Sequence, residues 1–464
     1  MAGHAVSINP ATGEELGRYA LLGPEGVEAR VAAAAATAVG WGAAPIETRT
    51  ACLARLGAVL TSRRDALARL ICLEMGKPIT AALAEVDKCA HLCGWYADHA
   101  GDLLADERPD VGGELAVVRY RPLGVILAVM PWNFPLWQVL RAAVPVMAAG
   151  NGFLLKHADN VQGCALALEA CFAEAGFPEA TFVVLQADRA AATALLADPR
   201  IAGLTVTAGV TAGSALAAEA GRHLKPSLLE LGGSDPFIVL ADADLDAAVA
   251  TAVTARFQNC GQVCIAAKRI IVERPVADAF VARFVAAAKA LKVGDPLDPA
   301  TQMGPLSRLR LRDEVHDQVR RSIEAGARLL TGGAAPQGPG AFYPPTVLVD
   351  VPEDAPVLRE ETFGPVAPIL VADDAEAAIR IANDSAFGLS AALWSGDADA
   401  AFALAGRIQT GAVFINGMSV SDPRVPIGGI RQSGYGRELS HFGLKAFTNP
   451  QLTWVRGPVA GGGR

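Results

Sequence analysis

The chain has 464 residues, 52% of them hydrophobic, and carries a formal net charge of -8. This length exceeds what one hydrophobic core usually supports, so at least two domains are expected. The apolar content excludes disorder along most of the chain, and the acidic balance excludes the basic surface by which proteins bind nucleic acid or anionic membranes.

The eight cysteines form no CxxC pair and no compact disulfide framework, which predicts a reducing compartment, the cytoplasm. Cys89 and Cys93 have no His or Asp cluster around them, so no metal site is expected. The N-terminus lacks the basic and apolar regions of a signal peptide. No run reaches the roughly 18 to 20 apolar residues that span a bilayer, so we expect a soluble protein.

A strand pair and a layer of helices are predicted for the first hundred residues. Residues 5–22 alternate around a turn at 11–14, which favours two paired strands. Apolar residues at helical spacing predict helices over 27–40, 48–72 and 81–105. No chemistry is visible in these helices.

Two segments far apart in the sequence, 116–122 and 451–456, look like strands. If they pair and project together, they form a flap whose open edge accepts another subunit. Ordinary terminal strands are the alternative.

From residue 123 onward, short apolar strands alternate with helices, as in a doubly wound α/β fold. The first series has strands over 124–130, 152–156, 181–185, 203–207 and 227–231 and helices over 136–149, 162–175, 188–197 and 211–220. A second series runs from Pro236 to about Gly434. Such parallel sheets bind ligands at the carboxyl ends of their strands.

Polar residues stand at several of these strand ends. Asn133 follows the first strand, where its amide could stabilise charge on a substrate oxygen, although an ordinary turn explains it equally. Lys156 and Asp159 follow the next strand and are of the types that hold ribose hydroxyls; a solvated loop is the alternative. At Thr207 and Gly209, a helix start could approach a pyrophosphate, but no GxGxxG fingerprint is present.

Three further residues have types suited to catalysis. Glu230 ends the last strand of the first series, and burial there would raise its pKa toward that of a general base. Cys264 is a candidate nucleophile, with Cys260 one helical turn earlier and Lys268 soon after. Glu361 lies two residues from Phe363, an aromatic that could pack on a flat ring. A capping or surface carboxylate, a buried structural thiol and an acidic turn are the respective alternatives.

Taken in order, these motifs resemble those of the NAD(P)-dependent aldehyde dehydrogenase superfamily over nearly the whole chain, and most closely a bacterial branch of succinate-semialdehyde dehydrogenases. The matching segments are PWNFP (131–135), LLK (154–156), ELGG (230–233), FQNCGQVC (257–264), EETFGPV (360–366) and GGIRQSGYGRE (428–438). The resemblance implies a Rossmann-type cofactor domain (1–105 and 123–231), an α/β catalytic domain (232–446) and a β oligomerisation flap (106–122 and 447–457).

The resemblance also implies a mechanism. Cys264 attacks the aldehyde, and Asn133 and the Cys264 backbone N–H hold the oxyanion of the thiohemiacetal. Glu230 activates the water that hydrolyses the thioester, with Glu438 as a relay. Backbone N–H groups and Glu230, rather than Lys268 or Arg269, are expected to activate the thiol, and Cys260 is expected to be a packing residue or the partner in a reversible disulfide.

NAD is the cofactor that the resemblance implies. Its expected binding residues are Trp132, Lys156, Asp159, Thr207, Gly209, Leu231, Gly232, Glu361 and Phe363. The carboxylate of Asp159 would repel a 2'-phosphate, which favours NAD and leaves NADP as a second cofactor.

Arg141 and Ser421 match positions that bind the distal carboxylate in succinate-semialdehyde dehydrogenases, and Trp137 and Gln258 complete the expected substrate site. Gln258 stands where some of those enzymes have a second arginine, and Arg424 is the alternative cation. The predicted reaction is oxidation of succinic semialdehyde to succinate by a homodimer or homotetramer. A glutaric semialdehyde or broader aldehyde dehydrogenase, and a non-enzymatic binding or structural protein on this scaffold, are the alternatives.

Overall fold

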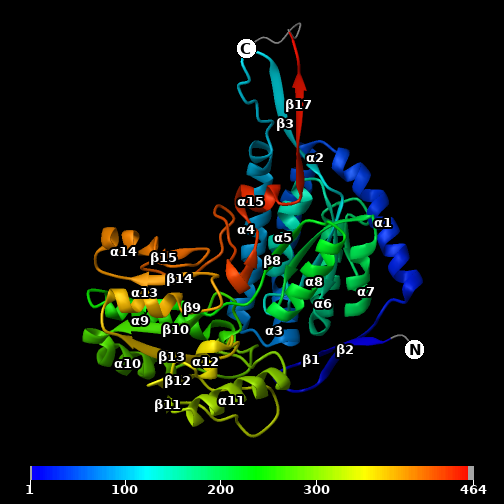
Figure 1. Ribbon diagram of the computed structural model, residues 1–464. Helices are drawn as coiled ribbons and strands as arrows, with labels where there is room; N and C mark the ends of the chain where they lie inside the picture. Colours follow the sequence, from blue (N-terminus) through cyan, green and yellow to red (C-terminus); the bar gives the residue numbers. More distant parts are fainter. Residues whose placement is uncertain (1–2, 458–464) are drawn as a thin grey trace.

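Two α/β units and a projecting two-stranded flap make up the structure (Figure 1). It is a computed structural model that describes residues 3–457. No helix within those residues is both long and apolar enough to cross a membrane.

The first unit is built on a six-stranded sheet of order β16-β8-β7-β4-β5-β6. Its strands are β4 (Val125–Met130), β5 (Gly152–His157), β6 (Phe182–Val184), β7 (Ile201–Thr207), β8 (Ser227–Glu230) and β16 (Gly434–Tyr435). All neighbours are parallel except β16, which runs antiparallel to β8. The carboxyl ends of β4, β5, β7 and β8 therefore meet at one edge, as the apolar runs predict.

Helices cover both faces of this sheet, because successive side chains of a strand point to opposite sides. Ile126 and Ala128 belong to one core, and Val125 and Leu127 to the other. The first core is completed by α2 (Ile46–Ser62), α3 (Arg64–Met75), α4 (Ile79–Leu103), α5 (Trp137–Ala148) and α6 (Gln162–Glu174). The second is covered by α1 (Pro24–Ala43), α7 (Arg189–Ala194) and α8 (Val210–Arg222), with the short η2 (Leu195–Ala197) after α7.

One predicted helix is divided in the structure. The range 48–72 is expected to be continuous, but α2 and α3 are separate because the chain leaves helical geometry at Arg63, with φ -98° and ψ 10°. A strand pair, β1 (His4–Ile8) and β2 (Glu15–Ala20), precedes these helices as expected.

The second unit is built on a seven-stranded sheet of order β11-β12-β13-β10-β9-β14-β15. Its strands are β9 (Asp235–Val239), β10 (Ala267–Glu273), β11 (Arg328–Thr331), β12 (Thr346–Val349), β13 (Val366–Ala372), β14 (Ala391–Trp394) and β15 (Val413–Ile415). One face packs on α9 (Leu245–Phe257), α10 (Arg274–Lys289), α11 (Leu309–Glu324) and α12 (Pro356–Arg359), and the other on α13 (Ala375–Asn383) and α14 (Ala398–Ala405).

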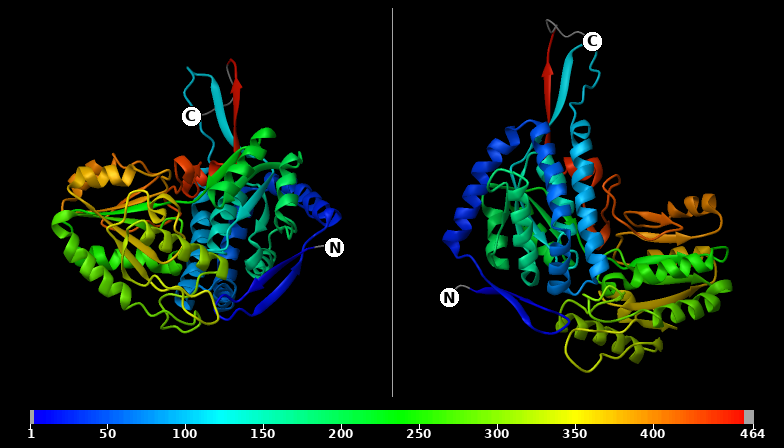
Figure 2. Two further views of the ribbon diagram at one scale, coloured as in Figure 1. Left: turned by 60° about the horizontal axis from the view of Figure 1, so that its bottom comes forward. Right: turned by 180° about the vertical axis from the view of Figure 1, so that it is seen from behind.

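The flap consists of β3 (Leu115–Pro122) and β17 (Thr448–Val455), paired antiparallel along their whole length. It projects away from both units in every view of the ribbon (Figures 1 and 2). The two remote segments thus pair as expected.

The chain returns to the first unit before it enters the flap. η4 (Arg431–Ser433) leads into β16, and the helix α15 (Ser440–Lys445) packs on α5. Leu439 and Leu444 belong to the core of the first unit. Residues 434–446, the part of the expected catalytic domain (232–446) whose assignment was left open, therefore pack on the first unit. A two-residue strand and a six-residue helix give little sequence signal of which sheet they join.

Candidate functional site

Cys264 follows a tight reversal of the chain at the end of α9. The segment η3 (Gln258–Gly261) contains three consecutive residues with left-handed backbone, with φ of 52° at Asn259, 56° at Cys260 and 71° at Gly261. A Cβ at Gly261 would collide with the carbonyl of Gly364, so glycine is required there. The reversal carries the thiol away from α9 and toward the first unit.

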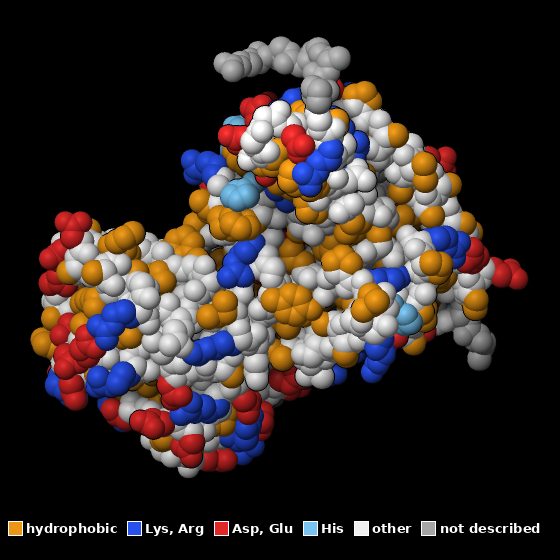
Figure 3. Space-filling view, turned by 45° about the horizontal axis from the view of Figure 1, so that its top comes forward, with side chains coloured by type: hydrophobic (Ala, Val, Ile, Leu, Met, Phe, Trp, Pro, Cys, Tyr) orange, Lys and Arg blue, Asp and Glu red, His pale blue; other side chains and the backbone are white. Residues whose placement is uncertain are grey.

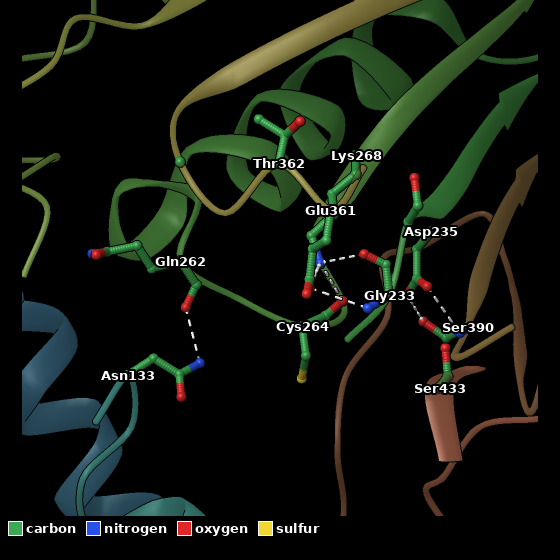
Figure 4. Close-up of polar contacts among 12 residues, drawn as sticks. Asn133, Gly233, Asp235, Gln262, Cys264, Lys268, Glu361, Thr362, Ser390 and Ser433 are labelled. Atoms are coloured by element: carbon green, nitrogen blue, oxygen red, sulfur yellow. Dashed lines mark hydrogen bonds and ion pairs between the residues drawn. The ribbon is translucent and has the colours of Figure 1, made fainter. Parts of the chain in front are cut away.

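Asn133 joins the two units at the thiol. It follows β4, and its Nδ2 donates to the Gln262 carbonyl at 3.0 Å, while Asn259 Nδ2 donates to the Asn133 carbonyl at 2.9 Å. Both asparagines are buried. Figure 4 shows the Cys264 side chain pointing away from Lys268, on the side of the loop where Asn133 lies. The amide therefore lies on the same side of the loop as the Cys264 sulfur, where the resemblance implies an oxyanion donor.

Lys268 ties the thiol loop to two neighbouring segments (Figure 4). Its Nζ donates to the Cys264 carbonyl at 2.8 Å, the Gly233 carbonyl at 2.7 Å and Glu361 Oε1 at 2.6 Å. Glu361 Oε1 also accepts from the Gly233 N–H at 3.1 Å. The sequence analysis discounted this lysine, because spacing along the chain does not show which carbonyls its ammonium group reaches.

Burial raises the pKa of the Cys264 thiol to about 11. The charges of Arg141 and Lys268 lower this pKa, whereas those of Glu230 and Glu361 raise it. The electrostatic effect of Glu230 is thus opposite to the expected activation, since a nearby carboxylate disfavours the thiolate. Arg269 donates to the carbonyls of Ser234, Ile381 and Ala382, away from the thiol, as expected.

Cys264 is the accessible thiol of the chain. All eight cysteines are free, and every one except Cys264 is buried. Cys260 packs in the core of the second unit with 1% of its surface exposed, in agreement with a packing role.

Glu230 ends β8 as a buried carboxylate, and burial raises its pKa. Among the described residues, its Oε1 has no hydrogen-bond partner. Gly428, with φ 151°, leaves the space beside this oxygen open, because a Cβ there would lie 2.7 Å from Oε1. A buried, unpaired acceptor with a raised pKa is suited to take a proton from water.

A buried ion pair lies beside Glu230. Arg141 on α5 pairs with Glu438, and both side chains are almost fully buried. The charge of Arg141 acts on both Glu230 and Cys264, and burial raises the pKa of Glu438 despite this partner. The proposed relay residue is therefore next to the base, and the proposed substrate arginine is held by a carboxylate of the chain itself.

Two of the other proposed substrate residues, Trp137 and Ser421, contact a lysine that was not predicted from the sequence. Lys88 Nζ donates to Ser421 Oγ at 2.7 Å and lies 4.0 Å from the ring centroid of Trp137. Gln258 lies half-buried in η3. Arg424 does not join this cluster, because its side chain is 72% exposed and pairs with Asp422.

Helix α4 contributes another charged side chain to the site, although no chemistry was visible in it. Glu85 Oε1 accepts from the backbone N–H groups of Leu136 and Trp137, at 3.0 Å each, and its carboxylate pairs with Lys77. It therefore caps the start of α5, directly after the Asn133 loop. The available signal was that Glu85 falls within the apolar face of α4, beside Ala82, Val86 and Cys89.

The predicted cofactor residues follow the strands of the first unit or lie in the Glu361 loop. At the end of β7, the buried Thr207 Oγ1 has no hydrogen-bond partner among the described residues, and Gly209 follows at the N-cap of α8. Lys156 Nζ, after β5, donates to Asp159 Oδ1 at 2.7 Å and to the His157 carbonyl at 2.8 Å. The unpaired hydroxyl and this ammonium group are suited to a phosphate or ribose at this sheet edge.

The remaining predicted cofactor residues include two aromatic rings and a glycine beside Glu361. The rings of Trp132 and Phe363 meet edge to face, with centroids 5.8 Å apart. A Cβ at Gly232 would collide with the Glu361 carboxylate, and Leu231 before it is buried. All predicted cofactor residues are thus near the carboxyl edge of the six-stranded sheet or the Glu361 loop.

A sequence model of the aldehyde dehydrogenase family matches residues 2–453 of the chain. The chain is 52% identical over 453 residues to the succinate semialdehyde dehydrogenase Sad of Escherichia coli, named for NAD(P)+, with 98% of each chain covered. It is 48% identical over 464 residues to the NADP(+) succinate-semialdehyde dehydrogenase of Mycolicibacterium paratuberculosis, also with 98% of each covered.

Solved structures share the fold. The succinic semialdehyde dehydrogenase of Streptococcus pyogenes, solved in complex with NADP+, matches with a TM-score of 0.95 and 36% identity, covering 97% of this chain and 99% of that one. The succinate-semialdehyde dehydrogenase of Burkholderia pseudomallei matches with a TM-score of 0.94 and 34% identity, covering 98% and 94%. The resemblance and the α/β fold expected from the motifs are confirmed.

Proposed function

Because the chain belongs to the aldehyde dehydrogenase family, we propose that it oxidises succinic semialdehyde to succinate with NAD(P)+. The observation that carries this proposal is the cationic surrounding of the thiol, in which the charge of Arg141 acts on Cys264, on Glu230 and on the neighbouring cation Lys88. A substrate with a distal carboxylate is attracted to a cationic site next to the thiol. The relatives named above as succinate semialdehyde dehydrogenases support the choice of aldehyde.

In the proposed mechanism, Cys264 Sγ attacks the aldehyde carbon as the thiolate. The Asn133 amide and the Cys264 backbone N–H donate to the oxygen of the thiohemiacetal. Thr207, Lys156 and Glu361 would hold NAD(P)+, which would supply the acceptor for the hydride of the substrate carbon. Glu230 then takes a proton from the water that hydrolyses the thioester, a contribution typically worth about 10² to 10⁴ in rate. Glu438 is placed to pass this proton on.

The cofactor preference follows from the Lys156–Asp159 pair. Asp159 is partly neutralised by Lys156, which weakens its repulsion of a 2'-phosphate. We therefore propose that NAD and NADP are both used, with NAD preferred. The free cysteines favour a reducing compartment, the cytoplasm. The flap is the proposed interface of a homodimer or homotetramer.

Reduction of NAD and NADP should be measured with succinic semialdehyde, glutaric semialdehyde and butanal. We expect the highest kcat/KM with succinic semialdehyde, and no reduction by Cys264→Ala, because the nucleophile is lost. Cys260→Ala is the matched control, since this neighbouring thiol only packs in the core. Reduction that survives Cys264→Ala would overturn the mechanism, and equal kcat/KM for butanal and succinic semialdehyde would overturn the substrate.

A further inference from the structure

Lys88 is a partly buried cation held in a fixed position. It lies on α4, where its Nζ donates to Ser421 Oγ at 2.7 Å and stands 4.0 Å from the ring centroid of Trp137. Ser421 and Trp137 are themselves buried. The ammonium group thus lies between a hydroxyl and an aromatic face. These two neutral groups orient it without neutralising its charge.

This cation lacks a counter-ion. Across residues 3–457, no carboxylate comes within 4.0 Å of Lys88 Nζ, and the neighbouring cation Arg141 is already paired with Glu438. Burial, followed by the charge of Arg141, lowers the pKa of Lys88 to about 8, while Cys89, Glu85 and Asp422 act in the opposite direction from farther away. A partly desolvated cation without a partner is stabilised by an anion that binds beside it.

Arg141 links Lys88 to the proposed reacting groups. Trp137, which it contacts, and Arg141 are four residues apart on α5 and so share one face of that helix, about 6 Å apart along its axis. The charge of Arg141 acts on Lys88 and also on Cys264 and Glu230. A short substrate bound at Cys264 can therefore place its far end beside Lys88.

We infer that Lys88, together with Ser421, binds the distal carboxylate of the aldehyde substrate. Lys88 supplies the uncompensated charge and Ser421 a hydroxyl donor, while Arg141 stays paired with Glu438 and adds its field. Lys88 is thus a specificity-determining residue, without a part in the chemical steps. The inference rests on the proposed function, because it needs an aldehyde at Cys264 that carries a second, anionic end.

The test compares kcat/KM for succinic semialdehyde with kcat/KM for butanal in the wild type, Lys88→Met and Lys88→Arg. Methionine keeps the length of the apolar stem and removes the charge. We expect the ratio to fall about 30-fold or more in Lys88→Met, chiefly through KM for succinic semialdehyde, and to be largely kept in Lys88→Arg. Arg424→Met, which removes a nearby but exposed cation, should leave the ratio as in the wild type.

The outcomes separate the two proposals. A wild type without preference for succinic semialdehyde overturns the proposed function, whatever the variants show. A wild type with the preference and a Lys88→Met variant that keeps it overturns only the role of Lys88. Thermal unfolding identifies a variant that fails to fold. In that case Ser421→Ala decides, since loss of its hydrogen bond should lower the ratio about fivefold and an unchanged ratio would overturn the inference.

Discussion

The environment of Cys264 favours the protonated thiol. Seven of the eight cysteines are packed in cores, and the remaining one is half-buried between two cations and two carboxylates. Burial has the largest effect and raises the pKa to about 11, so the thiolate is a small fraction at neutral pH. The pH dependence of the rate at which this thiol is alkylated should reveal that pKa.

We predict that alkylation of Cys264 by iodoacetamide accelerates about tenfold per pH unit up to pH 10. The sign follows from the raised pKa, because each unit below it leaves about ten times less thiolate. Incorporation should be followed by mass spectrometry without cofactor, with Cys264→Ala as the control, in which the buried thiols react slowly. A rate that levels off below pH 8 would contradict the raised pKa.

Sequence motifs identify the candidate catalytic residues more readily than the residues that contact and support them. Cys264, Glu230 and Asn133 each stand in a contiguous motif at a strand or helix end. In the structure Asn133 donates to the Gln262 carbonyl in the Cys264 loop, and the charge of Glu230 acts on Cys264. Lys88 was missed because its partner Ser421 is 333 positions away in the sequence. Neither local pattern nor charge spacing encodes such a contact, which arises only when α4 packs against the segment before Pro426.

Helix α4 positions the start of α5, and thereby the loop that carries Asn133. The buried carboxylate of Glu85 satisfies two N–H groups that the first turn of α5 cannot pair internally, and it neutralises the buried Lys77. Lys77 in turn lies 3.5 Å from the ring centroid of Phe134. Glu85 thus fixes both the start of α5, which follows the Asn133 loop, and Lys77, which contacts Phe134 in that loop.

We predict that Glu85→Ala lowers the free energy of unfolding by about 3 to 5 kcal/mol, because it leaves a buried ammonium group without a counter-ion. Urea unfolding followed by tryptophan fluorescence measures this loss. Asp87→Ala, on the same helix, removes an exposed ion pair with Arg64 and should cost under about 1 kcal/mol. Equal midpoints for the two variants would show that Glu85 adds no more than a surface charge.

The periodicity of hydrophobic residues predicted the strands and most of the helices. The apolar runs of β4, β5 and β7 were recognised because strands covered on both faces lack alternation. The break at Arg63 was missed, since arginine is a good helix former and nothing in the residues around it forbids a continuous helix. The choice of sheet that β16 joins was likewise not predicted, because it depends on pairing with β8, which is far away in the sequence.

At the scale of the whole molecule, the flap exposes large apolar side chains. Along β17, Leu452 and Trp454 are 52% and 41% exposed. Seen from the flap end, hydrophobic side chains also gather on the face at the foot of the flap (Figure 3). Such an edge is stabilised when another chain covers it.

We predict that the protein sediments as a dimer or tetramer and that Leu452→Asp combined with Trp454→Asp shifts it toward the monomer, because two charges enter an apolar interface. Analytical ultracentrifugation over a range of concentrations measures the shift. Val39→Asp, at an exposed position on α1, is the control. A wild type that stays monomeric at every concentration would refute the flap as an interface.

The left-handed reversal at Asn259–Gly261 has a consequence for how binding energy is used. Its shape is set by backbone conformation and by the contact of Gly261 with the Gly364 carbonyl, neither of which involves a ligand. The chain itself therefore preorganises the thiol. Free energy gained from the aldehyde and the dinucleotide need not be spent on ordering the nucleophile and remains available to lower the barrier to reaction.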